Sequence, residues 1–153
     1  MNTRIENHTY IIAELSANHG GSLDHACQTI HAMHEAGADA VKLQTYTPDT
    51  MTINSTRSEF MIGSGTIWEG RNLYDLYREA HTPWEWQPEI FRLANELGMD
   101  CFSTPFDKSA VDFLEDLNPP CHKIASFELV DLPLIEYVAS KGRPIIMSTG
   151  MGT

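Results

Sequence analysis

Charged and polar side chains recur at the ends of short apolar runs in this sequence. These side chains are Glu14, Lys42, Gln44, Thr104, Lys123, Ser126 and Ser148. Lysines act as point charges for phosphate or carboxylate groups, hydroxyls add hydrogen bonds, and a carboxylate can serve as a general base. The residue types therefore predict an anion-binding enzyme site. A structural bridge between Glu14 and either lysine is compatible with the same pattern, since a charge within an apolar strand is costly to bury unpaired.

Five apolar runs that are predicted to be strands position these residues. The runs are 10–15, 40–46, 100–104, 122–126 and 144–149. Helical spacing of apolar residues predicts helices between the runs, with Ser22 as a cap, a capping box at 82–85, and starts near Asp107 and Asp131. Strands that alternate with helices form a parallel sheet, whose carboxyl ends meet at one rim. We therefore expect the polar side chains to converge there.

Two architectures fit this alternation, an open doubly wound sheet and a (β/α)8 barrel of the TIM type. Residues 18–22 read NHGGS and lack the G-x-G-x-x-G fingerprint of the dinucleotide-binding sheet. A barrel needs about 250 residues. The 153 residues, which stop directly after a predicted strand, are therefore expected to be the first five strands and four helices of a barrel.

Residues 47–81 form one long excursion between the second predicted strand and its helix. Structureless loops longer than about 12–15 residues are usually functional lids or disordered. The many apolar side chains of this segment argue against disorder, and residues 73–80 are predicted to form a short helix. A lid over a pocket and a packed surface loop both remain open.

The overall composition excludes several classes of protein. A net charge of -11 disfavours nucleic acid as a partner, and no apolar run is long enough to cross a membrane. Residues 1–9 lack the apolar core of a signal peptide, and the three cysteines have no paired or metal-like spacing. A cytoplasmic location with reduced thiols is expected.

Several histidines and tryptophans carry no strong signal. His25, His31 and His34 are predicted to form a solvated helix face, because they lack the H-E-x-x-H pattern of zinc sites. His19 could touch a substrate or bond to loop backbone. The tryptophans could line a sugar pocket, although core packing is their usual role. They are Trp68, Trp84 and Trp86.

Five motifs together resemble the sialic acid synthase family in order and spacing. They are AELSANHGGS (13–22), VKLQTYTPD (41–49), CFSTPFD (101–107), KIASFE (123–128) and PIIMSTGM (144–151). Each motif alone is unspecific, but five in register span nearly the whole chain. WEGRNLYDLYREAHTPWEW (68–86) and the Ser16-Ala17 pair are more similar to the pseudaminic acid synthases of this family than to its N-acetylneuraminate synthases.

The resemblance implies a (β/α)8 barrel followed by a C-terminal antifreeze-like domain, usually in a homodimer. It implies that phosphoenolpyruvate condenses with an N-acylated amino sugar, here 6-deoxy-2,4-diacetamido-altrose, to give pseudaminic acid and phosphate. A divalent metal, manganese or magnesium, would polarise the aldehyde, and its ligands belong to later parts of the family's chains. We expect the 153 residues alone to be inactive.

The resemblance also implies a role for each polar residue at the rim. Lys42 and Lys123 would hold phosphoenolpyruvate, Glu14 would be the acid/base candidate, and Gln44 would face the sugar. Hydrogen bonds to the anionic groups would come from Thr104, Ser126 and Ser148. An asparagine of the neuraminate synthases has no clear counterpart, which puts N-acetylmannosamine in doubt as the substrate.

Three other functions remain open. The first is a synthase of N-acetylneuraminate or legionaminate. The second is a Schiff-base aldolase with Lys123 as its nucleophile. The third is a non-catalytic truncated protein that only binds its ligand.

Overall fold

The strands of the protein form one parallel sheet in the order of the chain. A computed structural model describes residues 8–150 and 152. Within these residues the sheet has the order β1-β2-β3-β4-β5. The strands are β1 (Ile12–Glu14), β2 (Ala40–Thr45), β3 (Asp100–Pro105), β4 (His122–Ile124) and β5 (Ile145–Met147). A doubly wound sheet reverses its strand order at a switch point, whereas a barrel does not. The sequential order confirms the predicted barrel type, here as a half-barrel.

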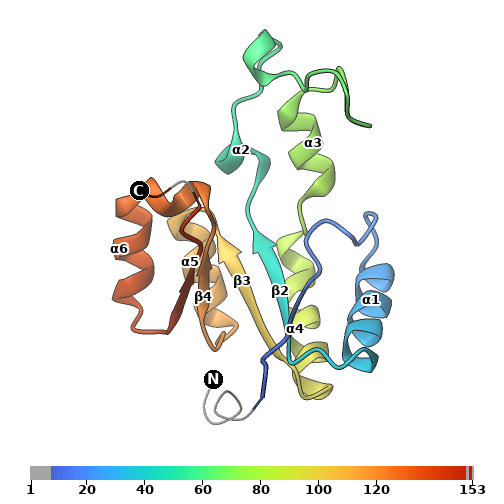
Figure 1. Cartoon of the computed structure of the whole chain (residues 1–153), viewed down its shortest axis with the longest axis vertical. Coiled ribbons are helices and arrows are strands. Elements are labelled where there is room, and N and C mark those ends of the chain that lie inside the picture. The colour runs from blue at the N-terminus through green and yellow to red at the C-terminus, as the bar shows by residue number, and fades with distance from the viewer. Residues whose placement is uncertain (1–7, 151, 153) are drawn as a thin grey trace.

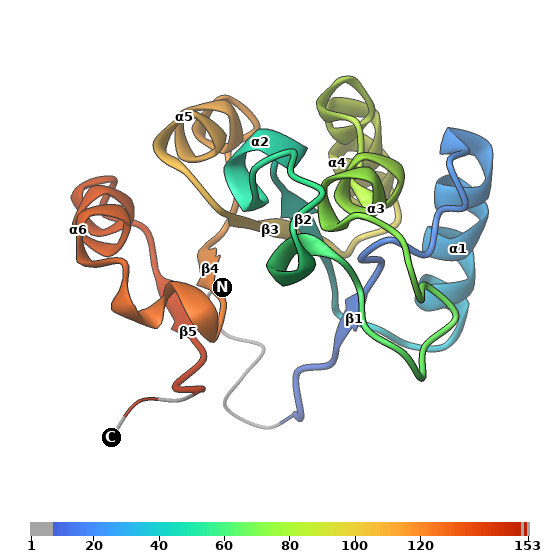
Figure 2. The same ribbon diagram turned by 90° about the horizontal axis from the view of Figure 1, so that it is seen from above.

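Helices cover the outer face of the curved sheet (Figures 1 and 2). They are α1 (Leu23–Glu35), α4 (Gln87–Glu96), α5 (Lys108–Asp116) and α6 (Leu132–Ser140). Alternate side chains of β2, among them Val41 and Leu43, are fully buried against Ile30 of α1 and Ile90 of α4. Because side chains alternate along a strand, Lys42 and Gln44 must face the opposite, inner side. None of the described helices is long and apolar enough to span a bilayer.

Three of the four predicted helix starts are confirmed, and one is wrong. Backbone N–H groups of the first turn donate to the side chains of Ser22, Asp107 and Asp131. The predicted capping box at 82–85 does not form. The Thr82 hydroxyl instead donates to the carbonyl of Ser16 at 3.4 Å, and Trp84–Trp86 forms a 3₁₀ turn before α4. The Thr82 side chain is buried against the first loop, which outweighs the local capping signal.

The 47–81 segment rises above the carboxyl ends of the strands (Figure 1). It contains α2 (Pro48–Met51), a 3₁₀ turn at Ser58–Phe60 and α3 (Leu73–Ala80), so the predicted helix at 73–80 is confirmed. An antiparallel bridge joins Met61 to Asn72. The segment is anchored to α5, because the Thr50 hydroxyl donates to Asp107 at 2.7 Å. It is therefore a folded unit rather than an open loop.

Replacement of Asp107 by alanine is expected to lower the free energy of unfolding by about 1–2 kcal/mol, the usual cost of a lost helix cap. Asp107 accepts hydrogen bonds from the Ala110 N–H at 2.8 Å and from the Thr50 hydroxyl. The substitution therefore removes both the cap of α5 and the contact between α5 and the 47–81 segment. Urea unfolding measures the effect. Asp116→Ala at the other end of α5 is the matched control, with a change within about 0.5 kcal/mol. Equal losses in the two variants would contradict the capping role.

Candidate active site

Glu14 and Lys42 form an ion pair at the ends of the first two strands. They are direct partners in the parallel register, and Lys42 Nζ lies 3.1 Å from Glu14 Oε1. The Lys42 side chain is only 10% exposed, whereas that of Glu14 is 57% exposed. The lysine is thus held in place by the strand and its partner, while the carboxylate faces open space. The structural bridge predicted from the sequence exists, and it leaves the carboxylate accessible.

Lys123 and Ser148 meet on the inner face at β4 and β5. Lys123 Nζ donates to Ser148 Oγ at 2.5 Å and to the carbonyl oxygen of Ile124 at 2.5 Å. Burial lowers the pKa of the Lys123 ammonium, and the positive charge of Lys42 lowers this pKa further. Glu14 and Glu128 act on it in the opposite direction. Two lysines from non-adjacent strands therefore share one electrostatic environment, which an anionic ligand would stabilise.

Gln44 and Thr104 lie one step further along the same face. They are register partners between β2 and β3, and Thr104 is almost fully buried. Their side chains share the orientation of Lys42, because residues two apart in a strand point to the same side. The sheet therefore brings together the lysine and both polar groups as the sequence predicts.

Ser126 lies beyond β4, in a loop that contacts the loop after β5. A Cβ atom on Gly150 would lie 2.5 Å from the Ser126 Cβ, so only glycine permits this approach. The predicted fourth strand is shorter than expected, because Ser126 precedes a 3₁₀ turn at Phe127–Val130. That turn places Glu128 near Lys123. The Ser126 side chain thus reaches the rim from a loop rather than from a strand.

Glu128 is a half-buried carboxyl near Lys123. Burial raises its pKa, and Asp131 adds to the rise, while Lys123 opposes it. Its Oε2 atom is buried and has no hydrogen-bond partner among the described residues. The sequence places Glu128 after the fourth strand, but it carries no signal of this unsatisfied oxygen. A buried acceptor without a partner is unusual in a folded protein.

A polar network on the outer side of the sheet supports the rim, and the sequence gives no sign of it. The Thr45 hydroxyl donates to Gln87 Oε1 at 2.8 Å and lies 2.6 Å from Ser103 Oγ. All three side chains are buried. They join β2, β3 and α4 directly behind Gln44 and Thr104, so the network fixes the strands that carry the site.

His19 bonds to the backbone on both ring nitrogens. Nδ1 accepts from the Gly21 N–H at 3.1 Å, and Nε2 lies 3.3 Å from the carbonyl oxygen of Ala80. The side chain is buried. Of the two roles predicted for His19, the structure supports bonding to the loop backbone. His25, His31 and His34 are exposed on α1, as predicted.

The rim residues do not form a metal site by themselves. No group of three or more His, Cys, Asp or Glu side chains that could hold a metal ion occurs within residues 8–150 and 152. The inner face carries two ammonium groups close to Glu14, which disfavours a cation there. The described donor set therefore fits an anion and does not fit the divalent metal implied by the resemblance.

Replacement of Lys123 by methionine is expected to raise the stability of the ligand-free protein by about 1 kcal/mol at neutral pH, because a partly buried charge with a lowered pKa is removed. A lysine with a lowered pKa binds fewer protons in the folded state than in the unfolded state. Its cost is therefore largest at neutral pH and disappears as the pH rises toward 10.5. Urea unfolding at pH 7 and at about pH 9.5 measures the difference. Exposed Lys108→Met is the control, and a Lys123→Met variant less stable than the native protein at pH 7 would contradict the expectation.

Known proteins of one family match nearly the whole chain. The sequence profile of the NeuB family matches residues 29–153. The pseudaminic acid synthase of Helicobacter pylori is 54% identical over 94% of this chain and 42% of its own length. That of Campylobacter jejuni is 48% identical over 99% of this chain and 44% of its own length. The chain thus spans less than half the length of these relatives.

The fold agrees with a solved structure of similar sequence. The N-acetylneuraminic acid synthetase of Leptospira borgpetersenii, solved with citrate, has a TM-score of 0.80 and 26% sequence identity. The match covers 96% of this chain and 46% of that protein.

Proposed function

The chain belongs to the NeuB family, and we propose that it is the N-terminal part of a synthase that joins phosphoenolpyruvate to an N-acylated amino sugar. The two lysines on the inner face carry this proposal. Lys42 and Lys123 come from non-adjacent strands, and burial together with the positive charge of Lys42 lowers the pKa of Lys123. In a protein with a net charge of -11, such an arrangement creates a local site for an anion.

The proposed sugar is 6-deoxy-2,4-diacetamido-altrose, and the proposed products are pseudaminic acid and phosphate. Identities of 54% and 48% with two pseudaminic acid synthases support this choice over N-acetylneuraminate or legionaminate. The remaining barrel strands, the antifreeze-like domain and a homodimer would belong to a longer polypeptide. The chain matches less than half of the length of these two relatives, which supports a longer polypeptide.

Each rim residue has a role in the proposed reaction. Lys42 and Lys123 bind the phosphate and carboxylate of phosphoenolpyruvate as point charges. Hydrogen bonds to these groups come from Thr104, Ser126 and Ser148. The electron pair of the C2=C3 double bond attacks the aldehyde carbon, the C–C bond forms, and the aldehyde oxygen takes up a proton to become a hydroxyl. Water then adds to the cationic C2 and loses a proton, and the bond from C2 to the phosphate oxygen breaks to leave a keto group and free phosphate.

Glu14 is the proposed acid/base group, and Gln44 contacts the sugar. The exposed Glu14 carboxylate lies beside Lys42, so it is close to the anion and can move a proton to or from water. The described residues offer no ligand set for manganese or magnesium. A divalent metal is therefore proposed only for the longer polypeptide, where its ligands would lie outside this chain and it would polarise the sugar aldehyde.

The test is phosphate release from phosphoenolpyruvate by the uninterrupted protein that contains this chain, with manganese added. The diacetamido sugar and N-acetylmannosamine are supplied in parallel. Release with only the first sugar supports a pseudaminic acid synthase. Release with only the second keeps the family chemistry but contradicts the proposed sugar, and release with neither contradicts the proposed reaction.

A Schiff-base aldolase is the second candidate, because burial lowers the pKa of Lys123, as in lysines that act as nucleophiles. Two contacts weigh against it. The Lys123 ammonium donates to both Ser148 and the carbonyl oxygen of Ile124, which favours its charged form. Borohydride in the presence of substrate would trap a covalent adduct on Lys123 if this mechanism operates.

A further inference from the structure

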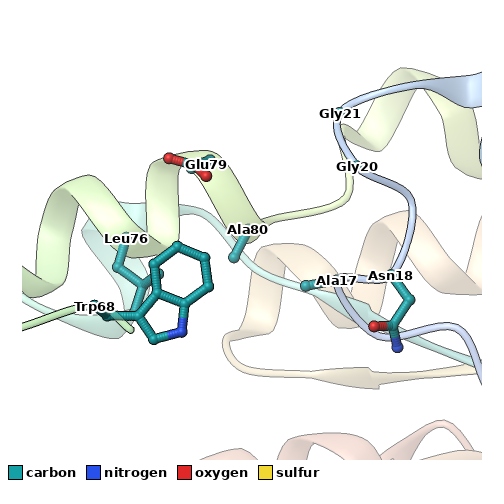
Figure 3. A pocket seen from close by; sticks show the side chains of 8 residues that line it. All are labelled: Ala17, Asn18, Gly20, Gly21, Trp68, Leu76, Glu79 and Ala80. Carbon is teal, nitrogen blue, oxygen red and sulfur yellow. The ribbon is translucent and has the colours of Figure 1, made fainter. Parts of the chain in front are cut away.

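A cavity of about 350 Å³ lies between the loop after β1 and helix α3 (Figure 3). One wall is the loop, with Ala17, Gly20 and Gly21. The opposite wall belongs to the 47–81 segment, and the indole ring of Trp68 lies there beside Leu76 and Ala80 in Figure 3. We call this cavity the Trp68 pocket.

The Trp68 ring is held in place by a neighbouring ion pair. The Arg71 guanidinium lies 5.3 Å from the centre of the ring and also donates to Glu79 at 2.6 Å. A cation at this distance is attracted to an aromatic face. Glu79 also lines the pocket, and its charge is balanced by Arg71. The pair leaves no free positive charge in this wall, whereas the lysines on the inner face offer ammonium groups to the phosphate of the substrate.

The loop wall is small because its backbone requires glycine. Gly20 and Gly21 have φ angles of +56° and +72°, which other residues rarely adopt. A side chain at Gly21 would project into open space. The loop is also tied to the 47–81 segment, through His19 and the carbonyl oxygen of Ala80. The cavity is therefore bounded by glycine backbone on one side and by an aromatic ring that contacts Arg71 on the other.

One wall of the pocket begins three residues after Glu14. Ala17 is three residues beyond Glu14, so their Cα atoms are at most about 11 Å apart. The loop leaves the sheet at a fixed point, because the Leu15 N–H donates to the carbonyl oxygen of Lys42 at 3.1 Å. An open-chain hexose that reacts beside Glu14 and Lys42 could place its far end in the pocket.

We propose that the Trp68 pocket binds an N-acetyl substituent of the sugar, at a carbon remote from the aldehyde. This inference rests on the proposed function. The acetyl methyl would pack on the indole ring, Leu76 and Ala80, where apolar surface is favourable. Asn18 also lines the pocket, and its backbone or side-chain amide would be the nearest polar partner for the substituent. A hydroxyl at the same carbon leaves the apolar wall unfilled, so the pocket selects acetamido over hydroxyl.

Steady-state kinetics of the uninterrupted protein test the selection. Trp68→Ala is expected to raise the KM for the diacetamido sugar about tenfold, the effect of a lost apolar contact in a specificity pocket. The KM for phosphoenolpyruvate should change less than twofold. Trp68→Phe should restore most of the loss. Ile67→Ala is the control, because Ile67 precedes Trp68 and is 90% exposed. An unchanged sugar KM in Trp68→Ala would overturn the inference.

An NMR titration separates failure of the pocket from failure of the proposed reaction. The indole N–H signal of Trp68, assigned by its loss in Trp68→Phe, should shift with the diacetamido sugar. It should not shift with an analogue that has a hydroxyl in place of the remote acetamido group. An unmoved signal in a protein that turns over the sugar would overturn the pocket. If no sugar yields phosphate, the proposed reaction fails, and the shift alone then decides whether the pocket binds acetamido groups.

Discussion

Alanine in place of Lys42 is expected to lower kcat/KM for phosphoenolpyruvate by about 10²- to 10³-fold in the uninterrupted protein. The Lys42 side chain is nearly buried and paired with Glu14 at 3.1 Å. In the proposed complex Lys42 also pairs with an anionic group of phosphoenolpyruvate, and loss of one partner from a desolvated charge pair between protein and ligand costs about 2–5 kcal/mol. Each 1.4 kcal/mol corresponds to about a tenfold change in rate. Phosphate release at varied phosphoenolpyruvate measures the effect, and most of it should appear in KM for this substrate.

Two further variants show whether the effect of Lys42→Ala comes from the lost charge, from the shape of the group, or from a general loss of stability. Lys42→Arg keeps the charge but replaces a compact ammonium with a planar group, so activity should recover only in part. Lys108→Ala is the matched control, because Lys108 is an exposed lysine on α5 whose Nζ lies 5.2 Å from the centre of the Tyr137 ring. Its kinetic constants should stay within twofold. A Lys42→Ala enzyme with unchanged KM for phosphoenolpyruvate would contradict anion binding by Lys42.

Most of the sheet could be predicted from the sequence because its signals are local. Val41, Leu43 and Thr45 alternate with Lys42 and Gln44, so one face is suited to helices and the other to a ligand. The parallel register then aligns Glu14 with Lys42 and Gln44 with Thr104. The convergence of these side chains follows from strand alternation and parallel pairing alone.

Contacts between distant residues could not be predicted in the same way. Thr45, Ser103 and Gln87 lie on three elements, and each has an ordinary local context. The link from Thr50 to Asp107 joins residues 57 positions apart. Thr82 illustrates the competition between local and distant partners. The local pattern predicts that Thr82 caps a helix, but its hydroxyl instead donates a hydrogen bond to the carbonyl oxygen of Ser16. Such partners depend on tertiary packing, which no short motif encodes.

The 47–81 segment could be predicted from the sequence only in part. Its helix at Leu73–Ala80 has a local signal, and the structure confirms it. The position of Trp68 does not have one, because the ring depends on Arg71 and on the loop after β1. A tryptophan in a sequence most often indicates core packing. Here Trp84 follows that rule against Phe113, with ring centres 4.9 Å apart, whereas Trp68 lines a cavity.

The second large effect is expected for Glu14→Gln, which should lower kcat by about 10²- to 10⁴-fold, the range for loss of an acid/base group. Glutamine has nearly the same shape and can still accept a hydrogen bond from Lys42. It cannot take up or deliver a proton as a carboxylate does. The change therefore removes the proposed chemistry while it preserves most of the contact at 3.1 Å.

The same variant distinguishes the acid/base role from a purely structural bridge. A bridge between Lys42 and an exposed carboxylate contributes only about 0–1 kcal/mol to stability. If Glu14 acts only in that way, Glu14→Gln should shift the urea midpoint slightly and leave kcat within severalfold of the native value. An acid/base role instead predicts a large fall in kcat with little change in the KM for phosphoenolpyruvate, because Lys42 and Lys123 still bind the anion. A fall in kcat with an unaltered pH profile would count against the carboxylate as the group that transfers the proton.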